Sequence, residues 1–232
     1  MRLSVLITVA SHHQRWLPHA LDSVLRQTYR EFDVLVLFDG MPPEEPASIA
    51  DDRVRQVIRP WCGRPRSLQT ALEKTEGDLV CWVDADDSVS PDAFEKCVEL
   101  YRQTKKPVYS DYQIIDESGH PVDFETSFGH FPFHLVVIPR WAIEMVGGFD
   151  PEMVHCCDAH MIRKVCYLTG HFQYIPEKLY QWRRHTCQMT SEFQNTREWM
   201  KIARARAKRW WEQEGGGPLV GNAIEIKVMK VE

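Results

Sequence analysis

The most informative stretch of this chain reads LVCWVDADD and occupies residues 79–87. Its apolar run is typical of a β-strand buried on both faces of a sheet, and it leads directly into acidic residues. Carboxylates spaced this closely repel one another strongly unless a cation lies among them. Asp84, Asp86 and Asp87 therefore indicate a divalent-metal site, and the alternative is a solvated turn in which Asp87 only caps the following helix.

Strands and helices alternate on both sides of this stretch. Apolar runs predict strands at about 3–9, 32–38, 54–58, 79–83, 107–115, 134–138 and 179–184, and helical spacing predicts helices at about 16–25, 67–75, 92–104 and 158–169. The alternation predicts an α/β fold with a mostly parallel central sheet and helices on both faces. Ligands of such sheets bind beyond the carboxyl ends of the strands, where Asp39 and the acidic cluster both lie.

The last part of the chain predicts a basic helix and then a strand. The helix covers residues 191–214, and it either packs the face that carries Trp199 and Trp210 on the domain or lies on a membrane surface. Residues 215–232 begin as a glycine-rich hinge and continue as an alternating strand, which could pair with a second copy of the chain in a homodimer.

Composition favours one domain and excludes some partners. The chain has 232 residues, 44% of them hydrophobic, and its 28 basic against 33 acidic residues give a net charge of −5, which argues against a nucleic-acid partner. The apolar run at the amino terminus is too short for a signal peptide, and no run approaches the roughly 20 residues of a spanning helix. We therefore expect a cytoplasmic protein, with the inner face of a membrane as the alternative location.

The seven cysteines contain no CxxC pair, which favours reduced, mostly buried thiols over a disulfide framework. A second interpretation takes the histidines and cysteines of residues 155–166 as a zinc cluster, although adjacent cysteines rarely serve one tetrahedral ion.

Two motifs resemble the inverting family 2 glycosyltransferases, which have the GT-A fold for nucleoside-diphosphate sugars. The run WVDADD at 82–87 and the helix segment ALDSVLRQTY at 20–29 are similar to the family's most recognisable segments. The resemblance covers about residues 3–190. It implies a GT-A domain at 1–190, with a nucleotide-binding half at 1–110 and an acceptor-binding half at 111–190.

The chain also departs from the family pattern. Phe38 precedes Asp39 where the family has an acidic residue, Gln69 replaces an asparagine, and Cys157 precedes Asp158 where an acidic pair is usual. The change at Cys157 leaves open how Asp158 or the acceptor hydroxyl is oriented.

The resemblance implies metal-dependent transfer of a sugar, with inversion by a single displacement. Asp84 would contact the ribose and the hydrated metal, Asp86 would bind the metal, and Asp158 would be the catalytic base, although Asp158 could also only cap its helix. His185 matches a family histidine that ligates the metal or touches the diphosphate, whereas an isolated histidine is more often structural. Mn²⁺ or Mg²⁺ suits these ligands, and an imidazole favours Mn²⁺.

The remaining expected contacts divide between donor and acceptor. Donor contacts are expected from Thr8, Ala10, Asp39, Arg66 and Ala85, and acceptor contacts from Phe131, Trp141 and Trp182. A carboxylate such as Asp39 can accept the N3–H of uracil or thymine, which favours a UDP or dTDP sugar. The acceptor would be a glycan, a lipid-linked molecule or another hydroxyl compound.

Two other classes of function remain open from the sequence. A nucleotidyltransferase also combines an α/β sheet with metal-binding carboxylates, but it normally carries an early glycine-rich phosphate loop, and residues 8–16 contain no glycine. A non-catalytic carbohydrate-binding protein would fit if Asp86 or Asp158 lay outside the crevice.

Overall fold

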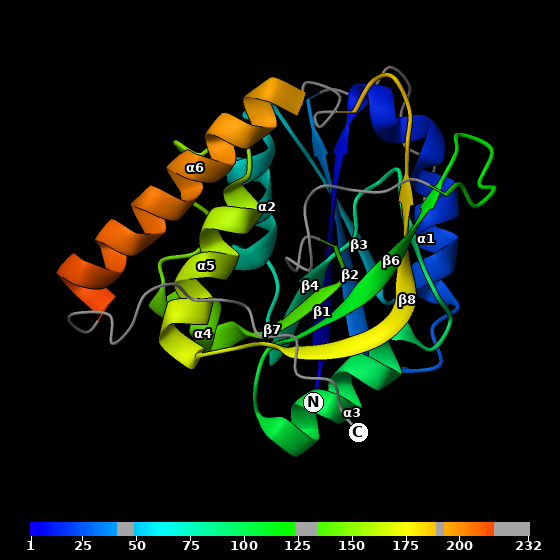
Figure 1. Ribbon diagram of the computed structural model, residues 1–232. Coiled ribbons are helices and arrows are strands. Elements are labelled where there is room, and N and C mark those ends of the chain that lie inside the picture. Colours follow the sequence, from blue (N-terminus) through cyan, green and yellow to red (C-terminus); the bar gives the residue numbers. More distant parts are fainter. Residues whose placement is uncertain (41–48, 124–133, 189–192, 216–232) are drawn as a thin grey trace.

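The computed structural model describes residues 1–40, 49–123, 134–188 and 193–215. Within these residues, one sheet has the strand order β3-β2-β1-β4-β7-β6-β8-β5 (Figure 1). The strands are β1 (Leu3–Ala10), β2 (Phe32–Asp39), β3 (Val54–Arg59), β4 (Leu79–Trp82), β5 (Ser88–Val89), β6 (Val108–Ile115), β7 (Val136–Pro139) and β8 (Gln173–Arg183).

The two halves of the sheet differ in strand direction. In the first half, β3, β2, β1 and β4 are all parallel, so the carboxyl ends of these strands meet at one edge. In the second half, β7 is antiparallel to both β4 and β6, while β6 and β8 are parallel. The predicted α/β fold is confirmed, and its parallel part is the half that leads into residues 84–87.

Helices cover both faces of the sheet, as the sequence predicted. They are α1 (Leu17–Leu25), α2 (Arg64–Glu73), α3 (Ala93–Thr104), α4 (Arg140–Met145), α5 (Cys157–Thr169) and α6 (Phe193–Trp210), with a 3₁₀ turn η1 (Ser11–Trp16) and a π turn η3 (Trp211–Gly215). Apolar residues of α1 and α3 share one core with alternate residues of β1 and β2. Residues of α2, α4, α5 and α6 form the core on the opposite face.

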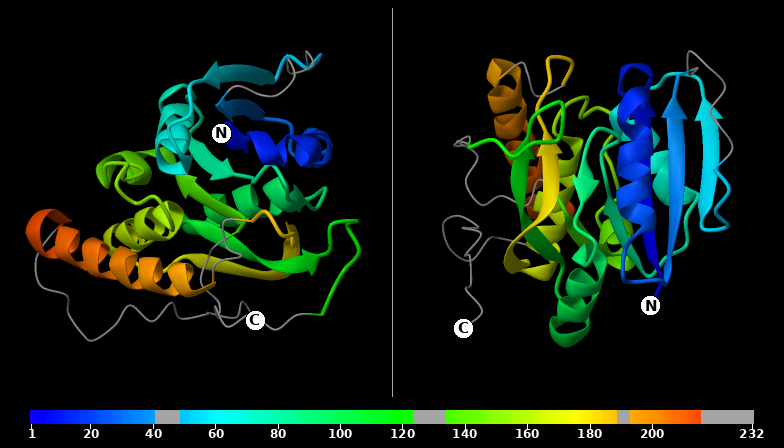
Figure 2. Two further views of the ribbon diagram at one scale, coloured as in Figure 1. Left: turned by 90° about the horizontal axis from the view of Figure 1, so that it is seen from above. Right: turned by 90° about the vertical axis from the view of Figure 1, so that its right-hand side faces the viewer.

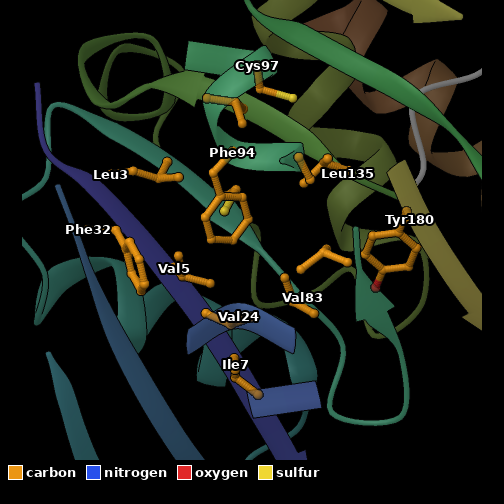
Figure 3. Close-up of a cluster of buried hydrophobic side chains, with 14 of the residues drawn as sticks. Leu3, Val5, Ile7, Val24, Phe32, Val83, Phe94, Cys97, Leu135 and Tyr180 are labelled. Carbon is orange, nitrogen blue, oxygen red and sulfur yellow. The ribbon is translucent and has the colours of Figure 1, made fainter. Parts of the chain in front are cut away.

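The first core shows why the strands are mostly apolar. Leu3, Val5 and Ile7 of β1 face Phe94 of α3 and Val24 of α1 (Figure 3), and each of the five is fully buried. The intervening residue Leu6 is also fully buried, but it belongs to the opposite core. A strand buried on both faces has apolar residues at most positions, which is the pattern in β1, where only Ser4 and Thr8 are polar.

Strand β8 is longer than predicted. It begins at Gln173 and not near residue 179, because its pairing with β6 continues through Tyr174 and Ile175. The register between β6 and β8 shifts at Ser110 and Asp111, opposite the part of β8 that contains Pro176. Proline is tolerated at such irregular positions, so its presence in the sequence concealed the first half of this strand.

The carboxy-terminal helix packs on the domain. In the left view of Figure 2, α6 runs along the outside of α5, and Ala203 and Ala207 of α6 are fully buried. Trp199 and Trp210 pack against the second core, which agrees with the packing interpretation of this helix. No helix in the described ranges combines the length and apolar character needed to cross a bilayer. The predicted strand in residues 216–232 lies outside the described residues.

Candidate active site

A pocket lies at the edge of the sheet where β1 and β4 end. It contains about 1010 Å³ of empty space, part of it open to solvent. Its lining comes from Thr8, His13, Arg64, Asp84, Ala85, Asp86, Asp87, His134, His155, Cys156, Asp158, Trp182, Gln188 and Thr196. The pocket therefore joins the turn after β4 to the start of α2, the start of α5 and strand β8, which are far apart in the sequence.

Asp87 holds the acidic turn against β8. Its Oδ2 accepts the Tyr180 hydroxyl at 2.7 Å and its Oδ1 accepts the Arg183 backbone N–H at 2.8 Å. Burial, together with the charges of Asp86 and Asp84, raises the pKa of the Asp87 carboxyl well above its usual value. The alternative role of Asp87 as a helix cap is wrong, because α3 begins only at Ala93, after Asp92.

Tyr180→Phe should lower the free energy of unfolding by about 1–3 kcal/mol. The Tyr180 hydroxyl donates to Asp87 and accepts the Asp84 backbone N–H at 3.1 Å, so its removal leaves two buried polar groups without this partner. Tyr109→Phe is the matched control, because the buried Tyr109 hydroxyl has no hydrogen-bond partner among the described residues. Urea unfolding of both variants measures the difference, and equal stabilities would contradict the role given to Tyr180.

Asp86 lies between two histidines. Its Oδ2 is 2.9 Å from His185 Nε2 and 3.7 Å from His13 Nε2. Burial opposes ionisation of Asp86, but the hydrogen bond to His185 and the nearby His13 outweigh it and lower the pKa of the carboxyl. The structure thus brings together Asp86 and His185, as the sequence predicted, and adds His13, which the sequence analysis did not select.

These three side chains could hold a divalent ion. One oxygen of Asp86 and one ring nitrogen of each histidine lie within 4.8 Å of one another. A carboxylate with two imidazoles is a ligand set that suits Mn²⁺ better than Mg²⁺. Within the described parts of the chain, no other group of three such ligands gathers, so residues 155–166 do not form the alternative zinc cluster.

Arg64 connects the acidic turn to the start of α5. Its Nη1 donates to Asp84 Oδ1 at 2.6 Å, and its Nη2 is 3.6 Å from Asp158 Oδ2. Burial raises the pKa of Asp84, and the Arg64 charge acts against this rise. Arg64 is therefore the cation that offsets the carboxylates facing the pocket.

Arg66 was predicted for this part of the site, but it is exposed and does not line the pocket. Helix α2 begins at Arg64, with Pro65 in its first turn, and not near residue 67 as expected. Two residues along a helix turn the side chain by about 200°, so Arg64 and Arg66 point in nearly opposite directions.

Asp158 lines the pocket from the first turn of α5. Its Oδ1 accepts the backbone N–H of Ala159 at 2.7 Å. The residue that caps α5 is Cys156, so Asp158 is not the cap considered in the sequence analysis. Cys156 has a φ of 54°, a left-handed conformation that costs energy for a residue with a side chain and that is frequent near functional sites.

The glycine pair before α5 fits tightly against α2. Gly148 has a φ of 68°, and a Cβ at this position would lie 2.2 Å from Gln69 Oε1. The same oxygen accepts the backbone N–H of Phe149 at 3.0 Å. Gln69 and the glycine thus fix the path of the chain that leads to Asp158.

Aromatic rings form the wall of the pocket opposite α5. Trp182 lines the pocket, and the His134 ring lies 5.0 Å from the ring of Trp182 and 5.2 Å from that of Tyr180. Burial lowers the pKa of His134 to about 3, so this imidazole is neutral at pH 7. The wall is therefore aromatic and uncharged, and it offers apolar ring faces to a ligand.

Trp141, another predicted acceptor residue, does not line the pocket. Trp141 is 51% exposed on α4, and the neighbouring Arg140 N–H bonds to the Asp78 carbonyl, which precedes β4. Trp141 therefore lies toward the opposite edge of the sheet, and its prediction as an acceptor contact is wrong. Phe131 lies outside the described residues.

The predicted donor residues lie at the expected edge. Thr8 and Ala85 line the pocket, while Ala10 and Asp39 are paired at the ends of β1 and β2 and do not line it. Asp39 Oδ1 accepts the Cys62 backbone N–H at 2.8 Å. This bond fixes the carboxylate beside the loop that leads to α2.

Comparisons with known proteins point to one family. The model of the family described as glycosyl transferase family 2 matches residues 4–165. An uncharacterized glycosyltransferase of Rickettsia conorii is 23% identical over 73% of this chain, and glycosyltransferase GlyA of Streptococcus pneumoniae is 29% identical over 58%. The chain spans 28% and 19% of the lengths of these two relatives.

Solved structures share the fold. The crystal structure of S. aureus TarS 1–349 superposes with a TM-score of 0.67 at 12% identity, over 92% of this chain and 73% of that one. The complex of the same fragment with UDP-GlcNAc gives a TM-score of 0.69 at 14% identity, over 88% and 66%.

Proposed function

Because this chain belongs to glycosyl transferase family 2, we propose that it transfers a sugar from a nucleoside-diphosphate sugar to an acceptor hydroxyl. The observation that carries this proposal is the meeting of Asp84, Asp86 and Asp158 in one pocket at the carboxyl ends of parallel strands. UDP and UDP-GlcNAc are bound in crystal structures of TarS, which has a similar fold. A UDP or dTDP sugar is accordingly the donor that we propose.

The donor would occupy the side of the pocket formed by the first half of the sheet. A divalent ion, Mn²⁺ or Mg²⁺, held by Asp86 and His185, would supply positive charge for the diphosphate of the leaving group. Arg64 offers a second positive charge near Asp84. The nucleoside would extend toward Thr8, Ala10 and Asp39, whose carboxylate can accept a pyrimidine N3–H.

Asp158 is the base in this proposal. Its carboxylate lines the pocket from the α5 side, across Arg64 from Asp84. Asp158 would take the proton of the acceptor hydroxyl as this oxygen attacks the anomeric carbon from the face opposite the diphosphate. A single displacement of this kind inverts the anomeric configuration. Trp182 would pack against the acceptor, which we propose to be a glycan, a lipid-linked molecule or another hydroxyl compound.

The proposal is tested by incubating the chain with a panel of radiolabelled nucleoside-diphosphate sugars and Mn²⁺. We expect hydrolysis of at least one pyrimidine nucleotide sugar in the absence of acceptor, and loss of this hydrolysis when a chelator is added. Absence of both binding and hydrolysis across the panel would contradict the proposed function.

Deleting residues 216–232 should leave this hydrolysis within about twofold of the full chain. The family match ends at residue 165, and among the described residues the lining of the pocket extends only to Thr196. Initial rates of the shortened and full chains provide the comparison, and circular dichroism shows whether the shortened chain is folded. A folded but inactive chain would show that the tail takes part in catalysis.

A further inference from the structure

The side chain of His13 has a buried nitrogen that the fold leaves without a hydrogen bond. His13 belongs to η1, the turn directly after β1, and only 14% of its side chain is exposed. Its Nε2 is buried and has no hydrogen-bond partner among the described residues. This atom points toward Asp86, but at 3.7 Å from Oδ2 it is too far for a good hydrogen bond. Nearly all buried polar atoms in proteins have a bonding partner, so this nitrogen is available to bind a ligand.

Neighbouring rings hold the two histidines in place around Asp86. The ring of His13 meets that of His185 edge to face at 5.4 Å, and Trp16 packs on His185 at 4.1 Å. Trp16 and the His185 side chain are buried. The ligand atoms therefore come from packed elements, and their spacing does not depend on a bound nucleotide.

We propose that His13 is a third protein ligand for a divalent transition metal, together with Asp86 and His185. The biological use of this metal site rests on the proposed function, because the ion would bind diphosphate oxygens at the positions that the three side chains do not fill. Two imidazoles favour Mn²⁺, Co²⁺ or Zn²⁺ over Mg²⁺, which prefers oxygen ligands. With three protein ligands, the chain binds the ion before the donor arrives, and the nucleotide does not have to bring it.

The test measures metal binding in the absence of any nucleotide. The full chain is titrated with Mn²⁺, and the loss of the free-ion signal in electron paramagnetic resonance counts the bound ions. We expect one bound ion per chain that a large excess of Mg²⁺ does not displace. His13→Ala should weaken Mn²⁺ binding at least about tenfold. Removing a residue that only hydrogen-bonds to a metal ligand typically lowers metal affinity about 10–100-fold, and removing a ligand should lower it at least as much.

His12→Ala is the matched control, since His12 is the adjacent histidine but is exposed and outside the pocket lining. We expect it to bind Mn²⁺ as the unchanged chain does. Electron spin-echo modulation from directly bound nitrogen gives a second measurement. It should detect two coordinated imidazoles in the unchanged chain, which requires no variant, and one in His13→Ala.

Two results would overturn the proposal: Mn²⁺ binding by His13→Ala equal to that of the unchanged chain, or a single coordinated nitrogen in the unchanged chain. Neither result depends on sugar transfer. Failure of this inference is therefore distinguishable from failure of the proposed function, which is judged by donor hydrolysis.

Discussion

Replacing Asp86 by alanine is expected to weaken Mn²⁺-dependent binding of UDP by roughly 100-fold or more. This loss of affinity exceeds the one expected for a residue that only hydrogen-bonds to a metal ligand. Asp86 supplies the anionic oxygen among the three clustered ligand atoms, and its Oδ2 is the atom nearest to both histidines. Without it, only the two imidazoles of the cluster would remain to hold the ion, and neither supplies a negative charge. Calorimetry with UDP and Mn²⁺ measures the loss directly.

The fold should survive this substitution. The backbone carbonyl of Asp86, which accepts Arg183 Nε at 2.8 Å, is retained in the alanine variant. Loss of the carboxylate also removes repulsion from Asp84 and Asp87, which offsets the loss of the hydrogen bond with His185. Asp22→Ala is the control, because Asp22 is exposed on α1 and pairs with Arg26 at 2.9 Å. Unchanged UDP affinity in the Asp86 variant would remove Asp86 from the metal site.

Much of the fold follows from local sequence patterns. Strands such as β1 and β2 are mostly apolar because both of their faces are covered, and this pattern is readable without a structure. The early start of β8 was not readable, because Pro176 interrupts the pattern and only the pairing with β6 shows that the strand continues. The sequence also gave no sign that β7 would run antiparallel between β4 and β6.

The candidate site was predictable where a motif carries the residue. Asp84, Asp86, Asp158 and Trp182 were selected from the sequence, and all line the same pocket. Their roles stay predictions.

Arg64 and His13 were missed for a different reason. The direction of a side chain depends on where its helix or turn begins, to within one residue. The first turn of α2 directs Arg64, not Arg66, to Asp84, and η1 directs His13 to Asp86. For His13 the sequence contained a usable signal, because His12 and His13 closely follow a buried strand.

The last expected result concerns Asp158→Asn, which should lower the rate of sugar transfer by a factor on the order of 10²–10⁴. An amide cannot accept the proton of the acceptor hydroxyl, whereas its size preserves the shape of the pocket. Binding of UDP should change little, because a general base acts in the chemical step. Transfer rates at saturating donor, together with UDP calorimetry, separate the two effects.

The substitution also separates catalysis from a purely structural role. Asp158 Oδ1 accepts the Ala159 N–H, and the oxygen of asparagine can accept the same bond, so α5 should begin as before. Asp150→Asn is the matched control, because Asp150 lies shortly before α5, pairs with Arg206 at 2.8 Å and does not line the pocket. If Asp158 served only the backbone, both variants would transfer sugar at the normal rate, and the catalytic assignment would be lost. If the product of the unchanged enzyme retained its anomeric configuration, a second nucleophile would be required and the single displacement by an acceptor activated at Asp158 would be wrong.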